Sequence, residues 1–206
     1  MYWTNAKLAM AMFDRMVNVE MKFDGAFLYY DLGYKNGLFF SLKRYEQQLH
    51  PMFKEFCRFF HNKDVKIILH SCGLVKDLIP YFIEERIDCL QPLEVKAGMD
   101  LIQLKEKYGD KIAFMGGIDV RLMAQDDPRL IEEEINEKIT VAKQGGGYIY
   151  HSDHSVPRNV SFQNYQRVIN LVKNMAGIHS YIWEVTQLPM SLAFLNVTVF
   201  PSHKGF

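Results

Sequence analysis

The sequence lacks an excess of charge of either sign. Its 206 residues include 24 basic and 24 acidic side chains, so the formal net charge at pH 7 is zero. A chain without a net positive field has no long-range attraction for the phosphates of nucleic acid or for an anionic lipid surface. We therefore expect no nucleic-acid partner and no membrane partner, and any effect of charge is local.

Cysteine is scarce. The sequence has only Cys57, Cys72 and Cys89. An odd and small number of cysteines does not fit a disulfide framework, and it favours a reducing compartment. We therefore predict a cytoplasmic protein whose cysteines are core residues or ligands.

Long hydrophobic runs are also missing. The apolar run at residues 8–13 stops at Asp14, which leaves it too short for a signal peptide. The run at 188–199 is interrupted by Ser191 and Asn196, and it is shorter than the roughly 20 apolar residues of a membrane helix. The sequence thus predicts no membrane span and no export signal.

Short β-rich runs alternate with helical patterns along most of the chain. The β-rich runs lie at residues 25–30, 65–69, 89–90, 112–115 and 148–150. Helical patterns lie at residues 7–21, from Ser41 to Phe60, and at 74–85, 99–108, 127–142 and 162–173. Buried, non-alternating strands separated by helices are typical of a parallel sheet covered on both faces.

Two helices have clear boundary signals. Asp127 and Pro128 form an N-cap followed by proline in the first turn, and the apolar face that follows ends at Gly145. Ser41 is an N-cap candidate for the second helical pattern, and His50-Pro51 should kink that helix.

The alternation predicts an α/β fold built from the C-terminal five strand–helix units of a (β/α)8 TIM barrel. A closed barrel of this type has eight such units. A helical pattern opens almost at Met1, so we expect that N-terminal units of longer relatives are missing. We assign residues 1–176 to this partial barrel and residues 177–206 to an irregular tail of unknown role. The unpaired edges of a partial barrel could support a homo-oligomer.

Polar residues collect where the predicted strands end. In parallel α/β folds the ligand lies at the carboxyl ends of the strands. The residues at these five ends are Asp31, then His70 and Cys72, then Gln91 and Glu94, then Gly116, Gly117 and Asp119, and finally His151, Asp153 and His154.

His70 and Cys72 are the sharpest pair in this set. A turn at a strand end can aim an imidazole and a thiolate at one point, and both are good ligands for zinc. A catalytic zinc needs about three protein ligands and an open position. The fifth strand end offers His154 or His151 as the third ligand. We predict a metal site of His70, Cys72 and His154, while a buried histidine beside an ordinary thiol remains the alternative.

The other strand-end residues are assigned to catalysis or to substrate. Asp31, Glu94 and Asp153 are the candidate catalytic carboxylates, as ligands or as acceptors that orient an imidazole. Asp31 fits a simple loop cap equally well. The candidate substrate-binding residues are Gly116, Gly117, Asp119 and His151. The Gly116-Gly117 pair also fits a simple tight turn, whereas Cys57 and Cys89 fit core positions.

Five motifs in order give the chain a family resemblance. They are DGAFLYYDLG at 24–33, LHSCG at 69–73, DCLQPL at 88–93, FMGGID at 114–119 and GGYIYHSDHSVP at 146–157. This succession resembles the later half of the uroporphyrinogen decarboxylase superfamily over roughly residues 23–173.

The resemblance implies one of two activities. The decarboxylases of haem synthesis need no cofactor, whereas the cobamide-dependent methyltransferases use zinc to hold a thiol that takes a methyl group from a corrinoid. The second branch typically shows H-x-C and a later cysteine. Here the H-x-C pair is His70 and Cys72, and His154 would stand in for the later cysteine.

Local charge favours the methyltransferase branch. Uroporphyrinogen carries many carboxylates, so its pocket should be basic. The strand ends are instead mostly acidic, with Asp31, Glu94, Asp119 and Asp153 against Arg121 and Arg158. We therefore expect a zinc-dependent methyltransferase with a corrinoid methyl donor, free or on a partner protein, and a small-molecule acceptor. The alternatives are a uroporphyrinogen decarboxylase with a tetrapyrrole substrate, or an inactive, incomplete barrel.

Overall fold

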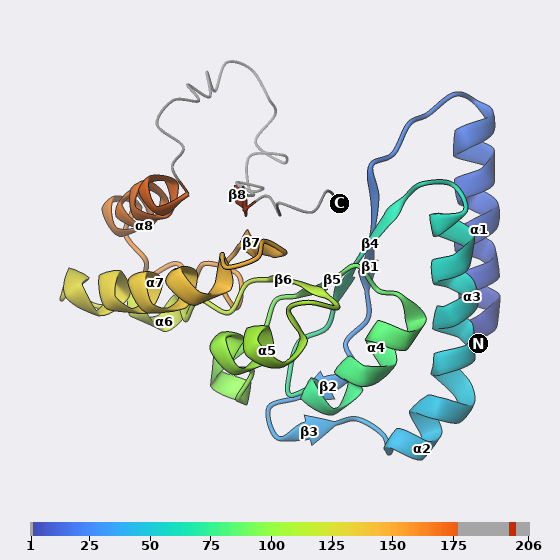
Figure 1. Ribbon diagram of the computed structural model, residues 1–206, viewed down its shortest axis with the longest axis horizontal. Helices are drawn as coiled ribbons and strands as arrows, with labels where there is room; N and C mark the ends of the chain where they lie inside the picture. The colour runs from blue at the N-terminus through green and yellow to red at the C-terminus, as the bar shows by residue number, and fades with distance from the viewer. Residues whose placement is uncertain (1, 177–197, 201–206) are drawn as a thin grey trace. The chain divides into compact units, whose positions relative to one another are not determined.

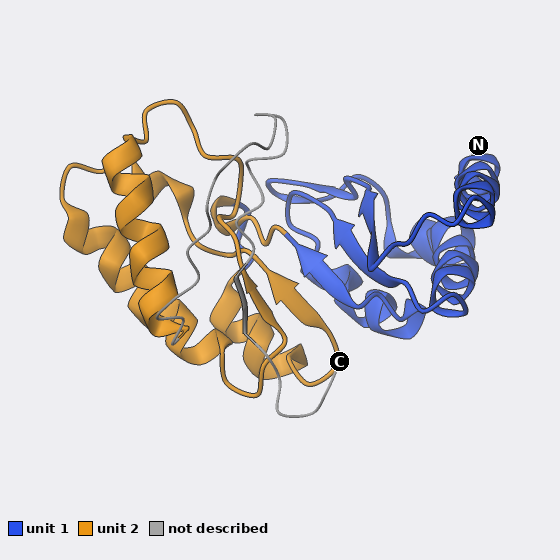
Figure 2. Ribbon diagram, turned by 90° about the horizontal axis from the view of Figure 1, so that it is seen from above, with its two compact units in different colours: residues 1–91, 97–99 blue, residues 92–96, 100–206 orange. Residues whose placement is uncertain are grey.

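The computed structural model describes residues 2–176 and 198–200 of the chain. These residues form α-helices and mostly parallel strands (Figure 1). The chain divides into two compact units, shown in blue and orange in Figure 2. Unit 1 comprises residues 1–91 and 97–99, and unit 2 comprises residues 92–96 and 100–206.

Unit 1 contains three parallel strands in the order β1-β4-β5. Its strands are β1 (Gly25–Tyr29), β4 (Lys66–His70) and β5 (Cys89–Gln91), with a small antiparallel hairpin of β2 (Gly33–Tyr34) and β3 (Gly37–Leu38). Its helices are α1 (Tyr2–Asn18), α2 (Leu42–Arg44), α3 (His50–His61) and α4 (Ile79–Glu85). Shorter helical turns are the π-helix at Tyr45–Leu49 and the 3-10 helix at Lys76–Leu78.

Unit 2 repeats the strand–helix alternation. Its strands β6 (Ala113–Met115) and β7 (Tyr148–Tyr150) pair in parallel, and β8 (Thr198–Phe200) pairs antiparallel with β7. Its helices are α5 (Leu101–Tyr108), α6 (Val120–Met123), α7 (Pro128–Ala142) and α8 (Phe162–Met175). A 3-10 turn at Val95–Ala97 lies where the chain passes between the two units.

The predicted α/β fold with five parallel strands, each followed by a helix, is confirmed. The helix at 7–21 is found at Tyr2–Asn18, and the one at 74–85 begins as a 3-10 turn before α4. The helix caps at Ser41 and Asp127 are also confirmed, because both side chains accept a backbone N–H of the first turn. Most of the predicted tail, 177–197 and 201–206, lies outside the described residues.

The expected kink at Pro51 takes the form of a π-helical turn. Residues Tyr45–Leu49 are π-helical, and Pro51 occupies the first turn of α3. Proline has no N–H to donate to the carbonyl four residues earlier, so the regular ladder changes at this point. The wider turn places Tyr45 at a fully buried position.

The core of unit 1 lies between the strands and the helices. Ile67, Leu69 and Leu90 are fully buried strand residues, and Phe53 and Phe82 bury the facing sides of α3 and α4. Burying a large aromatic or aliphatic side chain contributes about 1.5–3 kcal/mol. Ile67 and Leu69 therefore face the helices. Because side chains alternate along a strand, His70 projects from the opposite side of β4.

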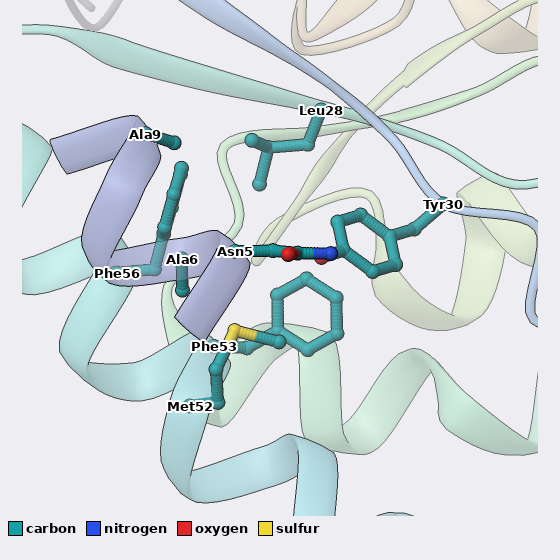
Figure 3. Close-up of a pocket in the computed structure, with 8 residues that line it drawn as sticks. All are labelled: Asn5, Ala6, Ala9, Leu28, Tyr30, Met52, Phe53 and Phe56. Carbon is teal, nitrogen blue, oxygen red and sulfur yellow. The ribbon is translucent and has the colours of Figure 1, made fainter. Parts of the chain in front are cut away.

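A small apolar cavity separates α1 from β1 and α3 (Figure 3). Its volume is about 80 Å³, and the residues that line it are Asn5, Ala6, Ala9, Leu28, Tyr30, Met52, Phe53 and Phe56. Further along α1, the ring centroid of Phe13 lies 4.7 Å from that of Phe60 and 5.0 Å from that of Phe23. The cavity is a packing gap on the helix side of β1.

Among the described residues, no helix combines the length and the apolar character needed to cross a bilayer.

Candidate metal centre

The end of β4 places His70 and Cys72 side by side. His70 is the last residue of β4, and Cys72 follows in the turn toward the 3-10 helix at 76–78. The His70 Nε2 atom lies 3.5 Å from the Cys72 Sγ atom. The predicted pairing of imidazole and thiol at this strand end is therefore present in the structure.

Asp31 joins this pair from the loop after β1. One oxygen of its carboxylate lies 3.5 Å from His70 Nε2. The same carboxylate accepts the backbone N–H of Cys72 at 3.0 Å, which holds the loop and the turn together. Ligand atoms of Asp31, His70 and Cys72 all lie within 4.8 Å of one another.

The turn that carries Cys72 is fixed by backbone contacts on both sides. The Ser71 hydroxyl accepts the N–H of Leu32 at 3.0 Å, and the Ser71 N–H donates to the carbonyl of Gln91 at 2.8 Å. Gly73 has a φ of +84°, and a Cβ there would lie 2.5 Å from the backbone of Gly33 and Tyr34. The turn therefore depends on glycine at position 73.

These distances fit the edges of a tetrahedral zinc site. Zinc binds imidazole nitrogen at about 2.0 Å and thiolate sulfur at about 2.3 Å, so tetrahedral angles separate the two atoms by about 3.5 Å. An imidazole nitrogen and a carboxylate oxygen around zinc are separated by about 3.4 Å. A Cys72 thiolate and the Asp31 carboxylate together carry the two negative charges that match a dication. The two separations that involve His70 and the charge of the donor set thus fit zinc, whereas the ligand atoms of Asp31 and Cys72 lie within 4.8 Å of each other and would have to approach to about 3.6 Å.

Gln91 orients the imidazole from behind. Its Oε1 atom lies 2.5 Å from His70 Nδ1, and both side chains are buried. An amide oxygen only accepts, so His70 Nδ1 donates to Gln91, and Nε2 is the ring nitrogen directed at Asp31 and Cys72. A ligand histidine in metalloproteins is held in this way by a second group. The sequence did not predict this role of Gln91, because only the strand register, which pairs His70 with Gln91, reveals it.

The cluster is accessible from one side. The His70 side chain is 9% exposed and that of Asp31 is 45% exposed, while Cys72 is half-buried. A site with a buried imidazole and an exposed carboxylate leaves room for a further ligand from solvent. A metal held by these residues would keep a position open to solvent, as catalytic zinc sites do.

Cys57 and Cys89 are core residues, as predicted. Both thiols are buried, and burial raises the pKa of each thiol well above its ordinary value. A thiol that stays protonated is a poor ligand and a poor nucleophile. Cys72 is thus the one cysteine of the three that is not buried.

Asp153 in unit 2 holds two loops in place. Its two carboxylate oxygens accept the backbone N–H groups of Val95 and Val120, at 3.0 and 2.9 Å. Burial raises the pKa of Asp153, and these two hydrogen bonds oppose that shift. The structure therefore gives this side chain a positioning role within unit 2, and its predicted catalytic role stays a prediction.

Asp119 caps α6 and pairs with Arg121. Its carboxylate accepts the Arg121 backbone N–H at 2.9 Å and also binds the guanidinium at 2.6 Å. Burial alone would raise the pKa of Asp119, but the hydrogen bonds from Arg121 lower it below its ordinary value. The side chain is thus ionised and used by its own helix, and its contact with substrate stays a prediction.

Gly116 and Gly117 form a tight turn. Their φ angles are +113° and +78°, and a Cβ at Gly116 would lie 2.0 Å from the carbonyl oxygen of Pro92. The Gly117 N–H donates to that same oxygen at 2.9 Å. The backbone groups are bonded within unit 2, which supports the turn interpretation over a substrate cradle.

The remaining predicted residues also lie in unit 2. Glu94 is buried and forms an ion pair with Lys96 at 3.1 Å. The His151 ring contacts the carbonyl oxygen of Ser152, and His154 is exposed. The predicted roles of Glu94, His151 and His154 stay predictions, and the described cluster in unit 1 offers Asp31 as a third donor.

Comparison with known protein families decides the relationship of the chain. The family model described as uroporphyrinogen decarboxylase (URO-D) matches residues 14–175. The chain belongs to the uroporphyrinogen decarboxylase family. No curated protein matches the chain.

The family match covers every candidate site residue, from Asp31 to His154. It confirms the superfamily and the enzymatic character of the family, and it agrees with the α/β strand–helix units of the structure. Membership of the family does not specify which reaction this chain catalyses, because that depends on the chemistry of its site residues.

Proposed function

We propose that the chain is a zinc-dependent methyltransferase that moves a methyl group from a corrinoid to a small thiol. The observation that carries this proposal is the 3.5 Å separation between His70 Nε2 and Cys72 Sγ, with the Asp31 carboxylate 3.5 Å from the same nitrogen. An imidazole, a thiol and a carboxylate at such separations are typical zinc ligands.

The residues of the site have separate tasks. His70, Cys72 and Asp31 would hold the metal, and Gln91 would keep the His70 Nε2 lone pair directed at it. When bound, zinc would lower the pKa of a thiol in the open position so that the thiol reacts as an anion at neutral pH. The exposed side of Asp31 gives that thiol access from solvent.

The transfer itself exchanges one bond for another. The thiolate sulfur forms a bond to the methyl carbon, the cobalt–carbon bond breaks, and its electron pair stays on the corrinoid cobalt. The thiol proton leaves to solvent before the transfer. The products are a methyl thioether and a reduced corrinoid, so no further oxidant or reductant is needed.

The electrostatics of the cluster favour this reaction over decarboxylation of a polycarboxylate. Asp31 presents a half-exposed carboxylate beside the imidazole. A substrate with many carboxylates would meet repulsion there, whereas a cation is attracted. This observation supports the methyltransferase branch of the family.

The proposal is tested with the purified, zinc-loaded chain, methylcobalamin and 2-mercaptoethanol. We expect loss of the methylcobalamin absorbance together with formation of the methyl thioether, measured by mass spectrometry. Cys72→Ala should abolish the reaction, and the matched variant Cys57→Ala should retain it because Cys57 is buried on α3. The proposal is wrong if wild type forms no thioether or if Cys72→Ala reacts as wild type does.

The same preparation is then incubated with uroporphyrinogen. We expect no coproporphyrinogen. Its formation by the metal-free chain would replace the proposed methyl transfer with decarboxylation.

A further inference from the structure

Two aromatic side chains of β1 are exposed beside the metal cluster. Phe27 is 50% exposed and Tyr29 is 69% exposed. Leu28 between them is buried and lines the cavity next to α1 (Figure 3). Since side chains alternate along a strand, Phe27 and Tyr29 project from the opposite side of β1, away from α1 and α3.

The same side of unit 1 carries the candidate zinc ligand His70. The register of β1 and β4 pairs Tyr29 with His70 and Phe27 with Ile68. The Tyr29 ring stacks on the imidazole with a centroid distance of 4.0 Å and an interplanar angle of 13°, and the Phe27 ring lies 6.1 Å from the imidazole. Two exposed aromatic rings thus continue from the metal ligand along the strand.

We propose that Phe27 and Tyr29, named here the aromatic shelf, bind the planar apolar body of the thiol substrate. This inference rests on the proposed function, because it assigns the substrate class of that site. A thiol whose sulfur reaches the centre defined by His70, Cys72 and Asp31 would place the rest of the molecule beside these rings. The occupant is therefore a neutral thiol with an aromatic ring.

The chemistry of the surroundings selects this class. Offset or edge contacts between aromatic rings stabilise a pair beyond the area they bury, whereas a saturated ring of equal size gains only the burial. The half-exposed Asp31 carboxylate disfavours a second negative charge on the substrate. Shape thus favours a planar ring, and charge favours a neutral molecule.

The test compares 2-phenylethanethiol with 2-cyclohexylethanethiol on the zinc-loaded full chain. We expect the phenyl thiol to bind about 10-fold more tightly, measured by competition against a reference thiol. Tyr29→Leu and Phe27→Leu should each remove most of this preference without changing the zinc content. The matched control is Phe162→Leu, an exposed aromatic at the start of α8 in unit 2, which should keep the preference.

A second measurement separates this inference from the proposed function. Binding of 2-phenylethanol to the metal-free chain is followed by saturation-transfer NMR in wild type and Tyr29→Leu. Signal in wild type that Tyr29→Leu abolishes supports the shelf even if the chain binds no zinc. Zinc binding and methyl transfer without any phenyl preference would overturn the shelf and leave the proposed function standing.

Self-association gives a further outcome. If sedimentation shows a dimer that Phe27→Leu and Tyr29→Leu both dissociate, the two rings are an interface between copies of the chain, and the substrate assignment is wrong. We expect both variants to sediment as wild type does.

Discussion

Gln91, the neutral amide beside the proposed metal ligand His70, is the most informative single residue of the site. Gln91 accepts the Nδ1 proton of His70, and this contact decides which ring nitrogen faces Asp31 and Cys72. Without it, the buried ring could present either nitrogen, and part of the population would offer a protonated atom to the metal.

We therefore predict that Gln91→Leu weakens zinc affinity by about 10- to 100-fold. Gln91→Glu should retain most of the affinity, because a carboxylate also accepts the Nδ1 proton. Competition with a chelating dye measures both values. Equal affinities for wild type and Gln91→Leu would show that Gln91 does not control the ring.

The buried carboxyl group of Glu85 links three helical segments of unit 1. Glu85 accepts the Tyr45 hydroxyl hydrogen at 2.8 Å and contacts His50 Nδ1 at 2.8 Å. Burial raises the pKa of Glu85 to about 8, while burial lowers the pKa of His50. Burial also raises the pKa of the Tyr45 hydroxyl, which therefore stays protonated as the donor.

This raised pKa predicts a pH dependence of stability. Between about pH 4.5, the ordinary value, and about pH 8, the folded state retains a proton on Glu85 that the unfolded state has released. The free energy of unfolding should therefore fall as the pH rises through this window, by a few kcal/mol at most, since one pKa unit is about 1.4 kcal/mol. The lowered pKa of His50 acts in the opposite direction near its ordinary value of 6.5.

Urea unfolding at pH 5, 6, 7 and 8 measures this effect. Glu85→Gln should flatten the decline, whereas Glu84→Gln should preserve it because the Glu84 side chain is 60% exposed. A decline that persists unchanged in Glu85→Gln would assign the pH dependence to other groups.

The sequence allowed part of the site to be predicted, for physical reasons. His70 and Cys72 are close because two residues in one strand-end turn cannot lie far apart, so their spacing was sufficient. Asp31 was expected at a strand end as a ligand or an orienting acceptor. Its contact with the His70 imidazole, and the contact made by Gln91, depend on the pairing of β1, β4 and β5, which no local pattern encodes. Asp119 pairs with Arg121 through a local helix cap. Asp153 binds backbone N–H groups that are 33 and 58 residues away in sequence, which no local pattern reveals.

At the scale of elements, the turn after β4 carries two of the three proposed metal ligands or lies directly beside them. Gly73 allows the chain to reverse against the β2–β3 hairpin, where the Leu74 N–H donates to the carbonyl of Tyr34 at 2.9 Å. The position of Cys72 relative to Asp31 depends on this packing.

We predict that Gly73→Ala destabilises the chain by more than about 2 kcal/mol. The substitution adds a collision with the Gly33 and Tyr34 backbone to the strain of a positive φ. Gly145→Ala is the matched control, because Gly145 has a φ of +70° and nothing within 4 Å of the added Cβ. It should cost only about 1 kcal/mol. Thermal and urea unfolding compare the two variants, and equal costs would mean that the turn relaxes without loss.

Element boundaries show what local patterns can and cannot determine. The side-chain caps at Ser41 and Asp127 fix helix starts within a few residues, so sequence and structure agree there. The π-helical turn before Pro51 was expected only as a kink, because its form depends on the burial of Tyr45 against Glu85. The β2–β3 hairpin was missed, since two-residue strands have no detectable periodicity.

At the scale of the whole molecule, the repeated strand–helix order was predictable because each unit carries its own apolar strand and amphipathic helix. Both compact units show this order, and the family match covers most of their length. The predicted domain boundary at residue 176, the predicted role of residues 177–206 and oligomer formation remain predictions.

The central claim is that the turn after β4 binds a metal, and zinc stoichiometry tests it most directly. Purified wild-type chain, loaded with zinc and dialysed, is assayed by inductively coupled plasma mass spectrometry beside His70→Ala, Cys72→Ala, Asp31→Asn and Cys57→Ala. We expect about one zinc ion per wild-type and Cys57→Ala chain, and a clear loss in the variants of His70, Cys72 and Asp31. Absence of zinc from the wild type, or full retention by Cys72→Ala, would contradict the account.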